Sequence, residues 1–218
     1  WSGGLDMSDG VYLFDQFRIG NKAEVYLQTR FFPNEKAHDR NVSMKKTNFL
    51  STTRSMEYQK NFEYRVVKFE NKTTKIIPIH NKERFYDALD LQITSDGNLM
   101  LIGFYSPLEE EMMPVGAVAL KVNAKTGAIQ ESTKEFGNAY EMPSDITIKN
   151  NGLAAGKDQY LKYRFLLSDI HFNKNGGYTL IGERNVTQTK RTQTSYYTVN
   201  HLDDLAVVDV SAAGAVTG

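Results

Sequence analysis

The sequence contains no cysteine among its 218 residues. This absence excludes disulfide bonds, thiolate metal sites and a cysteine nucleophile at once. A chain without thiols suits export through an oxidising compartment, where stray thiols react, although many cytosolic proteins also lack them. No other motif has the ligand spacing of a metal or cofactor site, so we expect neither a metal nor a cofactor.

Long apolar runs and a dominant charge are also missing. No stretch approaches the roughly 20 apolar residues of a transmembrane helix, so we expect no transmembrane segment. Lys and Arg total 26, as do Asp and Glu, which leaves no global field for nucleic acid or an acidic membrane. Nucleic acid is therefore not an expected partner. The chain begins at Trp1 without a signal-peptide pattern, and we expect that it was processed or begins within a longer polypeptide.

The sequence does contain a repeated order of strands and turns. Residues 88–94 alternate between apolar and polar side chains, which predicts a half-buried strand. The following turn contains Asp96-Gly97, which favours a tight hairpin. The unit continues with strands predicted at three places: 99–105, 116–122 and from Ala128 onward.

The same order returns later in the chain and, more weakly, at its beginning. Gly182 takes the place of Gly103, and the first turn is marked by Gly97 and by Gly177, 80 residues further on. The repeated strands are predicted over 165–172, 178–183 and 205–210. The opening copy has Gly10 as its marker, with strands predicted over 11–14, 63–69 and 74–79.

Four hairpin-linked strands in a repeated order are typical of a β-propeller blade. We therefore predict an all-β, β-propeller-like fold with four-stranded antiparallel blades; a non-repeating sandwich is the alternative. The period exceeds the roughly 40–50 residues of a typical blade, which predicts long polar insertions at 32–60 and 135–160. The predicted units are a partial first blade or blades over 1–87, a blade over 88–164, and a further blade, truncated at its C-terminal end, over 165–218. Because a ring needs about four to eight blades, we expect the propeller to be incomplete in this chain.

Two segments, "GGYTLIGERN" and "DDLAVVDVSAAGAV", follow the pattern of a blade. The residues that carry this pattern are Gly176, Gly177, Tyr178, Gly182, Glu183, Asp204, Val207, Val208 and Gly214. The chain here resembles uncharacterised secreted propeller-type repeat proteins of the Bacteroidota. The resemblance implies export to the periplasm or cell surface, with association to the outer membrane. It implies no catalytic residues.

A basic segment with interleaved aromatic residues is the first candidate binding site. Its residues are Lys45, Lys46, Phe49, Arg54 and Tyr58. Such side chains can contact a sugar polymer, a lipid head group or an acidic partner. A solvated insertion is the alternative interpretation.

Glu183 is the second candidate. It follows Gly182 at the predicted end of an apolar strand, where propeller strands approach a loop-lined face. The alternative interpretation is structural, with Glu183 acting as an ion-pair partner or as an acceptor for a backbone group. Its neighbour Arg184 is a nearby cation, although adjacent residues of a strand point to opposite faces.

Other motifs predict no chemistry. Residues 152–157 lack the spacing and the hydroxyl residue of a phosphate-binding loop. Residues 109–111 form an acidic loop, and Asp6, Ser8 and Asp9 are turn residues with an incomplete series of calcium ligands. The histidines form no helical zinc pair; they are His38, His80, His171 and His201.

The sequence therefore predicts a non-catalytic interaction or scaffold module of a bacterial envelope assembly, with a protein partner. A carbohydrate-active enzyme or a glycan-binding lectin on the same scaffold is the alternative. Three or more carboxylates converging on one pocket would favour the enzyme, whereas scattered carboxylates and an apolar contact surface would favour the scaffold.

Overall fold

The computed structural model describes residues 5–34, 62–108, 114–136, 162–191 and 196–217. These residues form eleven β-strands, all of which pair antiparallel. The described part of the chain contains no helix long and apolar enough to cross a membrane. Most of both predicted insertions, 32–60 and 135–160, lies outside the described residues.

The strands form three sheets in which each strand pairs with the next along the chain. The first sheet contains β1 (Val11–Ile19), β2 (Val25–Phe32), β3 (Glu63–Glu70) and β4 (Thr73–Ile79). The central sheet contains β5 (Arg84–Ile93), β6 (Leu99–Pro107), β7 (Gly116–Val122) and β8 (Ile129–Glu135). The third sheet contains β9 (Lys162–Phe172), β10 (Tyr178–Arg191) and β11 (Tyr196–Val210). The prediction of four-stranded antiparallel units is thus confirmed for the first and central sheets.

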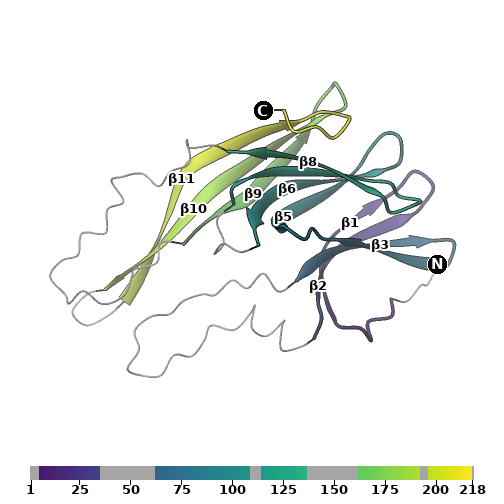
Figure 1. Cartoon of the computed structure of the whole chain (residues 1–218), viewed down its shortest axis with the longest axis horizontal. Coiled ribbons are helices and arrows are strands. Elements are labelled where there is room, and N and C mark those ends of the chain that lie inside the picture. Colours follow the sequence, from purple (N-terminus) through teal and green to yellow (C-terminus); the bar gives the residue numbers. More distant parts are fainter. Residues whose placement is uncertain (1–4, 35–61, 109–113, 137–161, 192–195, 218) are drawn as a thin grey trace.

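The central sheet packs between the other two (Figure 1). Along β6, Leu99, Leu101 and Tyr105 join the core shared with the first sheet. The alternate residues, Met100, Ile102 and Phe104, join the core shared with the third sheet. Because successive side chains of a strand point to opposite faces, burial of both faces explains why β6 is almost continuously apolar.

The first strands of successive sheets lie close together. β1 contacts β5, and β5 contacts β9. Each of these strands also contains a bulge, at which the pairing register shifts by one residue. The extra residues are Asp15, Asp87 and Ser168. A bulge bends a strand and increases its twist. The three first strands are therefore bent in the same way, in addition to lying close together.

One turn type recurs through the fold and corrects the predicted repeat. In four five-residue loops, the amide of the first residue donates a hydrogen bond to the carbonyl of the fifth, and the amide of the fourth residue donates to the carbonyl of the first. These loops are 20–24, 94–98, 173–177 and 211–215. This is a type I turn followed by a residue in the left-handed region. That residue is Gly97, Gly176 or Gly214 in three of the loops, and Ala23 in the fourth.

Two predicted equivalences were therefore wrong. The counterpart of Gly97 is Gly176 and not Gly177, because only Gly176 has the positive φ of the turn. Gly10 precedes the first strand of its sheet, so it has no such counterpart, and Ala23 occupies the matching place. The sequence hid this copy because alanine carries no turn signal. The equivalence of Gly103 and Gly182 holds, since each lies six residues after the left-handed residue.

Candidate functional site

The two ends of the sheets differ in the length of their connections. Short turns join β1 to β2, β3 to β4, β5 to β6, β7 to β8, and β9 to β10. At the opposite end lie the strand ends that flank the longer connections, which join β2 to β3, β6 to β7, and β8 to β9. We call these ends the turn edge and the connection edge. Because binding residues concentrate on loops held by a rigid scaffold, the connection edge is where a functional site is expected.

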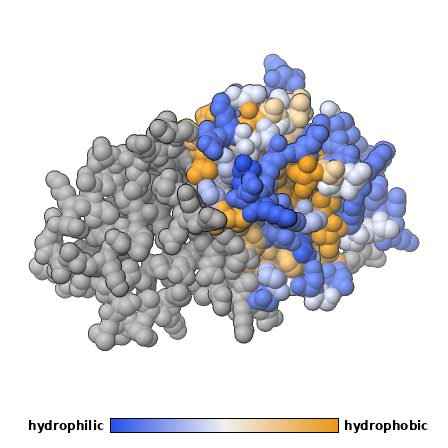
Figure 2. All heavy atoms as spheres, viewed as in Figure 1, coloured by the Kyte–Doolittle hydropathy of each residue, from blue (hydrophilic) through white to orange (hydrophobic). Residues whose placement is uncertain are grey.

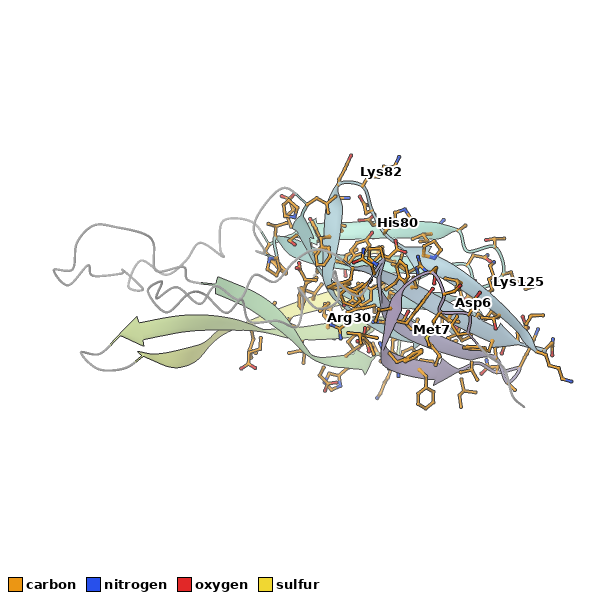
Figure 3. All side chains as sticks on the ribbon, turned by 90° about the horizontal axis from the view of Figure 1, so that it is seen from below. Asp6, Met7, Arg30, His80, Lys82 and Lys125 are labelled. Atoms are coloured by element: carbon orange, nitrogen blue, oxygen red, sulfur yellow. The ribbon has the colours of Figure 1, made fainter. Side chains whose placement is uncertain are left out.

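A cleft opens at the connection edge between the first and central sheets. Its volume is about 100 Å³. The short connection from β4 to β5 forms one side, with His80 and Asn81, and Leu108 at the end of β6 contributes another. In Figure 3, His80 and Lys82 mark this connection, and Lys125 lies on the turn that joins β7 to β8.

Aromatic rings form the floor of the cleft. Phe62 lies at the centre, with its ring centroid 5.0 Å from that of Phe85 and 5.5 Å from that of Tyr64, in edge-on contacts. Phe32 packs behind it at 5.6 Å. Edge-to-face pairs at these distances add to the stability from burial. The floor is therefore a cluster of mutually packed aromatic rings.

Polar groups lie beside this floor in two clusters of three side chains each. On one side, the Glu63 carboxylate lies 2.7 Å from Arg65 Nε and 3.7 Å from His80 Nδ1. On the other side, Asn81 Nδ2 donates to Glu131 Oε2 at 2.7 Å. Arg84 Nη1 lies 3.3 Å from Glu131 Oε1. Both carboxylates are thus held by neighbouring side chains.

Tyr86 completes the cleft beside Asn81 and Glu131. Burial, helped by the charge of Glu131, raises the pKa of Tyr86 well above its ordinary value. The hydroxyl therefore stays protonated at physiological pH and serves as a hydrogen-bond donor.

Arg65 connects the cleft to the start of the chain. Its Nη1 lies 2.7 Å from Asp9 Oδ2 and 2.5 Å from the Tyr12 hydroxyl. The guanidinium carbon lies 3.2 Å from the centroid of the Phe31 ring. Burial alone would lower the pKa of Arg65, but the hydrogen bonds to Asp9, Glu63 and Tyr12 raise it. Arg65 remains charged and holds Glu63 in position at the cleft.

The residues predicted from sequence lie elsewhere. Lys45, Lys46, Phe49, Arg54 and Tyr58 fall outside the described residues, in the connection from β2 to β3.

The structure does not bring Glu183 to the cleft. Glu183 lies on β10 between Leu205 and Leu166, in the third sheet, whereas the cleft lies between the other two sheets. It forms no hydrogen bond or ion pair with another described side chain. The suggested neighbour Arg184 has a side chain outside the described part.

Several motifs have a structural explanation or cannot be assessed. Asp6 accepts a hydrogen bond from the amide of Ser8 at 2.9 Å, as in a turn. His171 is exposed and lies 3.1 Å from Asp169. Residues 109–111 and 152–157, His38 and the side chain of His201 lie outside the described part. Among the described residues, no three His, Asp or Glu side chains are grouped to hold a metal ion.

Sequence reasoning missed the cleft itself. Phe62, Phe85 and Tyr86 all line it, yet each lies just outside the strands predicted over 63–69 and 88–94. One signal was present, since the run from 84 to 86 contains two aromatic residues directly after the polar turn 80–83. Aromatic residues at the start of a strand that follows a turn lie at one end of the sheet, next to the connections, and this is where the cleft is found.

The fold and the cleft define an all-β protein of stacked antiparallel sheets, with an aromatic-floored cleft between two of them at the connection edge. Comparison of the chain with protein-family models, curated proteins and solved structures finds no match. The functional argument therefore depends on the geometry described above.

Proposed function

We propose that the three stacked sheets are successive blades of a β-propeller. Adjacent blades of a propeller pack face to face around a central axis, and their first strands gather at that axis. The contacts of β1 with β5 and of β5 with β9 agree with this arrangement. The recurrence of one turn type at matching places in all three sheets supports it further.

On this scaffold the chain acts as a non-catalytic interaction module for a protein partner, through the connection edge. The observation that carries this proposal is the cleft, which combines an aromatic floor with a polar rim. Protein interfaces have the same composition, with an apolar centre enriched in aromatic residues and arginine and with a polar periphery.

The size of the cleft favours a protein partner over a free small molecule. Sites for small ligands measure about 300–1,000 Å³, whereas this cleft measures about 100 Å³. That volume suits one side chain of a partner, anchored between the sheets. The sequence-based prediction that Lys45, Lys46, Phe49, Arg54 and Tyr58 contact a partner stays a separate prediction.

Enzymatic cleavage of glycans has less support. Glycoside hydrolysis generally uses two carboxyl groups that flank the scissile bond. The described lining of the cleft contains one carboxylate, Glu63, which is bonded to Arg65. Glu131, which is bonded to Asn81 and Arg84, is not part of this lining. A lectin would present open ring faces for stacking, but each of the four lining rings is less than a tenth exposed; these are Phe62, Tyr64, Phe85 and Tyr86.

The proposed setting is the bacterial cell envelope, in the periplasm or at the cell surface with association to the outer membrane. This part of the proposal is supported by the resemblance of the blade segments, together with the absence of cysteine.

Site-specific photo-crosslinking in the native cells tests the proposed function. A photoreactive residue at His80, on the rim of the cleft, is expected to capture one protein in stoichiometric yield. The matched control places the same residue at Lys125, which is exposed on the turn edge, and is expected to capture none. Equal capture at both positions, or capture of glycan in place of protein at His80, would overturn the proposal.

A further inference from the structure

The charged side chains that line the cleft already have partners within the protein. The carboxylate of Glu63 is bonded to Arg65 and lies 3.7 Å from His80 Nδ1. Arg84 Nη1 lies 3.3 Å from the carboxylate of Glu131. Each charged side chain of the described lining therefore faces an opposite charge.

Asn81 uses both ends of its amide in the same way. Its Nδ2 donates to Glu131 at 2.7 Å, and its Oδ1 accepts a hydrogen bond from the backbone amide of Glu83 at 2.8 Å. We call the partner side chain that enters the cleft the anchor. A charged anchor would give up its water and meet only charges that are already paired, and burial of a charge on these terms is unfavourable. The lining therefore disfavours an acidic or a basic anchor.

The aromatic floor disfavours an aromatic anchor. The rings of Tyr64 and Phe85 pack edge-on against Phe62, and the Arg30 guanidinium carbon lies 5.7 Å from the centroid of the Phe62 ring. These three aromatic residues are each less than a tenth exposed, so they offer little ring face for stacking. A closed cavity of about 150 Å³ holds a benzene ring. The cleft measures about 100 Å³, so an aromatic side chain is too large to enter it fully.

Apolar surface is available at the rim of the cleft. Leu108, at the end of β6, and Ile79, at the end of β4, both line the cleft, and Leu108 is 41% exposed. Figure 2 shows that hydrophobic side chains reach the surface of the described part among polar ones. Removal of such apolar surface from water by an aliphatic side chain is favourable, and it requires no charge to leave its partner.

We propose that the anchor is a branched aliphatic side chain of leucine size, presented on the surface of the protein partner. Its methyl groups contact Leu108 and the edges of the floor rings, while the ion pairs of Glu63 and Arg84 stay intact. The inference rests on the proposed function, because it names the side chain that this function places in the cleft.

Blocked tripeptides test the chemical class of the anchor. The probes are acetyl-Gly-X-Gly-amide peptides with leucine, phenylalanine, lysine, glutamate or glycine at X, added at millimolar concentrations to the full chain with labelled methyl groups. The leucine peptide is expected to shift the methyl resonances of Leu108 and Ile79. Burial of one leucine side chain predicts that it binds about tenfold or more tightly than the glycine peptide. The aromatic and charged peptides are expected to bind more weakly than the leucine peptide.

Two matched variants show whether the leucine peptide binds at the cleft. Leu108→Ala removes apolar contact area and is expected to weaken binding of the leucine peptide by about threefold or more. Ile129→Ala is the control, because Ile129 is 38% exposed and lies outside the cleft lining; its affinity is expected to equal that of the native chain. Circular dichroism checks that both variants are folded.

Three results would each overturn the aliphatic anchor. They are the absence of a shift with the leucine peptide, tighter binding of the phenylalanine, lysine or glutamate peptide, and equal affinities in Leu108→Ala and Ile129→Ala. Any of them together with capture of one protein at His80 refutes the anchor class and leaves the partner site in place. Failure to capture a protein at His80 refutes the proposed function itself, so the two failures are distinguishable.

Discussion

Gln28 on β2 donates a hydrogen bond from Nε2 to the backbone carbonyl oxygen of Leu89 on β5, over 2.6 Å. Gln28 is fully buried, and Gln16 donates to its Oε1 at 2.9 Å. Since β5 is an edge strand of the central sheet, a side chain of the first sheet supplies a donor to one of its carbonyl groups. The first and central sheets are thus joined by a polar contact as well as by the apolar core.

Removal of this amide is expected to destabilise the fold. Gln28→Leu leaves the buried carbonyl of Leu89 without its donor, which costs about 1–3 kcal/mol of unfolding free energy. Gln16→Leu is the control, because Gln16 is only partly buried and contacts Leu89 through Gln28 alone; its expected effect is less than half as large. Urea unfolding measures both. An equal loss in the two variants would contradict the role given to the Leu89 contact.

Ala23 is expected to be a site where glycine stabilises the protein. Its φ is 64°, and an L-residue in the left-handed region costs about 1–2 kcal/mol. Ala23→Gly removes this strain at the expense of a more flexible unfolded chain, for a net gain of about 0.5–1 kcal/mol. Thermal unfolding followed by circular dichroism measures the gain.

The matched control lies in an equivalent turn. Ala213 directly precedes the left-handed residue Gly214 and has an ordinary negative φ. Ala213→Gly relieves no strain, so it is expected to lower the stability by about 0.5–1 kcal/mol. Effects of the same sign in both variants would refute the explanation from backbone strain.

Much of the fold was predictable because its signals are local. The alternation of 88–94 and the Asp96-Gly97 turn predicted the hairpin of β5 and β6, and the strand predicted over 116–122 has the observed bounds of β7. The prediction for the opening copy was displaced by one strand. Its turn has Ala23 in the left-handed conformation that glycine usually adopts, so the sequence carries no glycine there to mark the turn. The strands β10 and β11 extend to Arg191 and from Tyr196, through polar residues that lack the apolar alternation of a buried strand.

The cleft was not predictable in the same way. Its floor joins Phe62 of the first sheet to Phe85 of the central sheet, and no local pattern states which face of one sheet meets which face of another. Glu183, chosen from its position in the chain, proved to lie in another sheet. Contacts between sheets depend on stacking, which the sequence shows only through the repeat.

The contact of Gly182 with the Phe104 ring is expected to control the packing of the third sheet. A Cβ on Gly182 would collide with this ring, which is fully buried and cannot move away. Gly182→Ala is expected to cost about 1–3 kcal/mol through overpacking. Phe104→Leu replaces the ring with a smaller side chain and leaves room for the added methyl group. The double variant is therefore expected to lose less unfolding free energy than the sum of the two single losses. Additive losses in a double-mutant cycle would contradict this contact.

Asp96 is expected to make the stability sensitive to acid. A hydrogen bond from the Thr94 hydroxyl lowers the pKa of this carboxyl well below its ordinary value, despite the opposing effect of partial burial, and Asn98 and Lys121 add to the shift. Because the folded pKa is lowered, the stabilisation is present above the unfolded value of about 4 and is lost as the pH falls below it.

Asp96→Asn tests this pH dependence. Asn175 already occupies the equivalent place in the turn 173–177 and accepts a hydrogen bond from Gly177 N at 3.0 Å, so asparagine fits the turn. The variant is expected to show a shallower loss of unfolding free energy between about pH 4 and pH 2 than the native chain. Identical slopes in urea unfolding across this range would rule out Asp96 as a source of acid sensitivity.

The proposed function is tested most directly by the affinity of the captured partner for two matched variants. Leu108 lines the cleft and is 41% exposed, while Ile129, on β8, lies outside the cleft lining and is 38% exposed. Leu108→Asp is expected to weaken binding by about tenfold or more, equivalent to roughly 1.4 kcal/mol, with Ile129→Asp close to the native affinity. Unchanged affinity in Leu108→Asp, or equal losses in both variants, would contradict a partner site at the cleft.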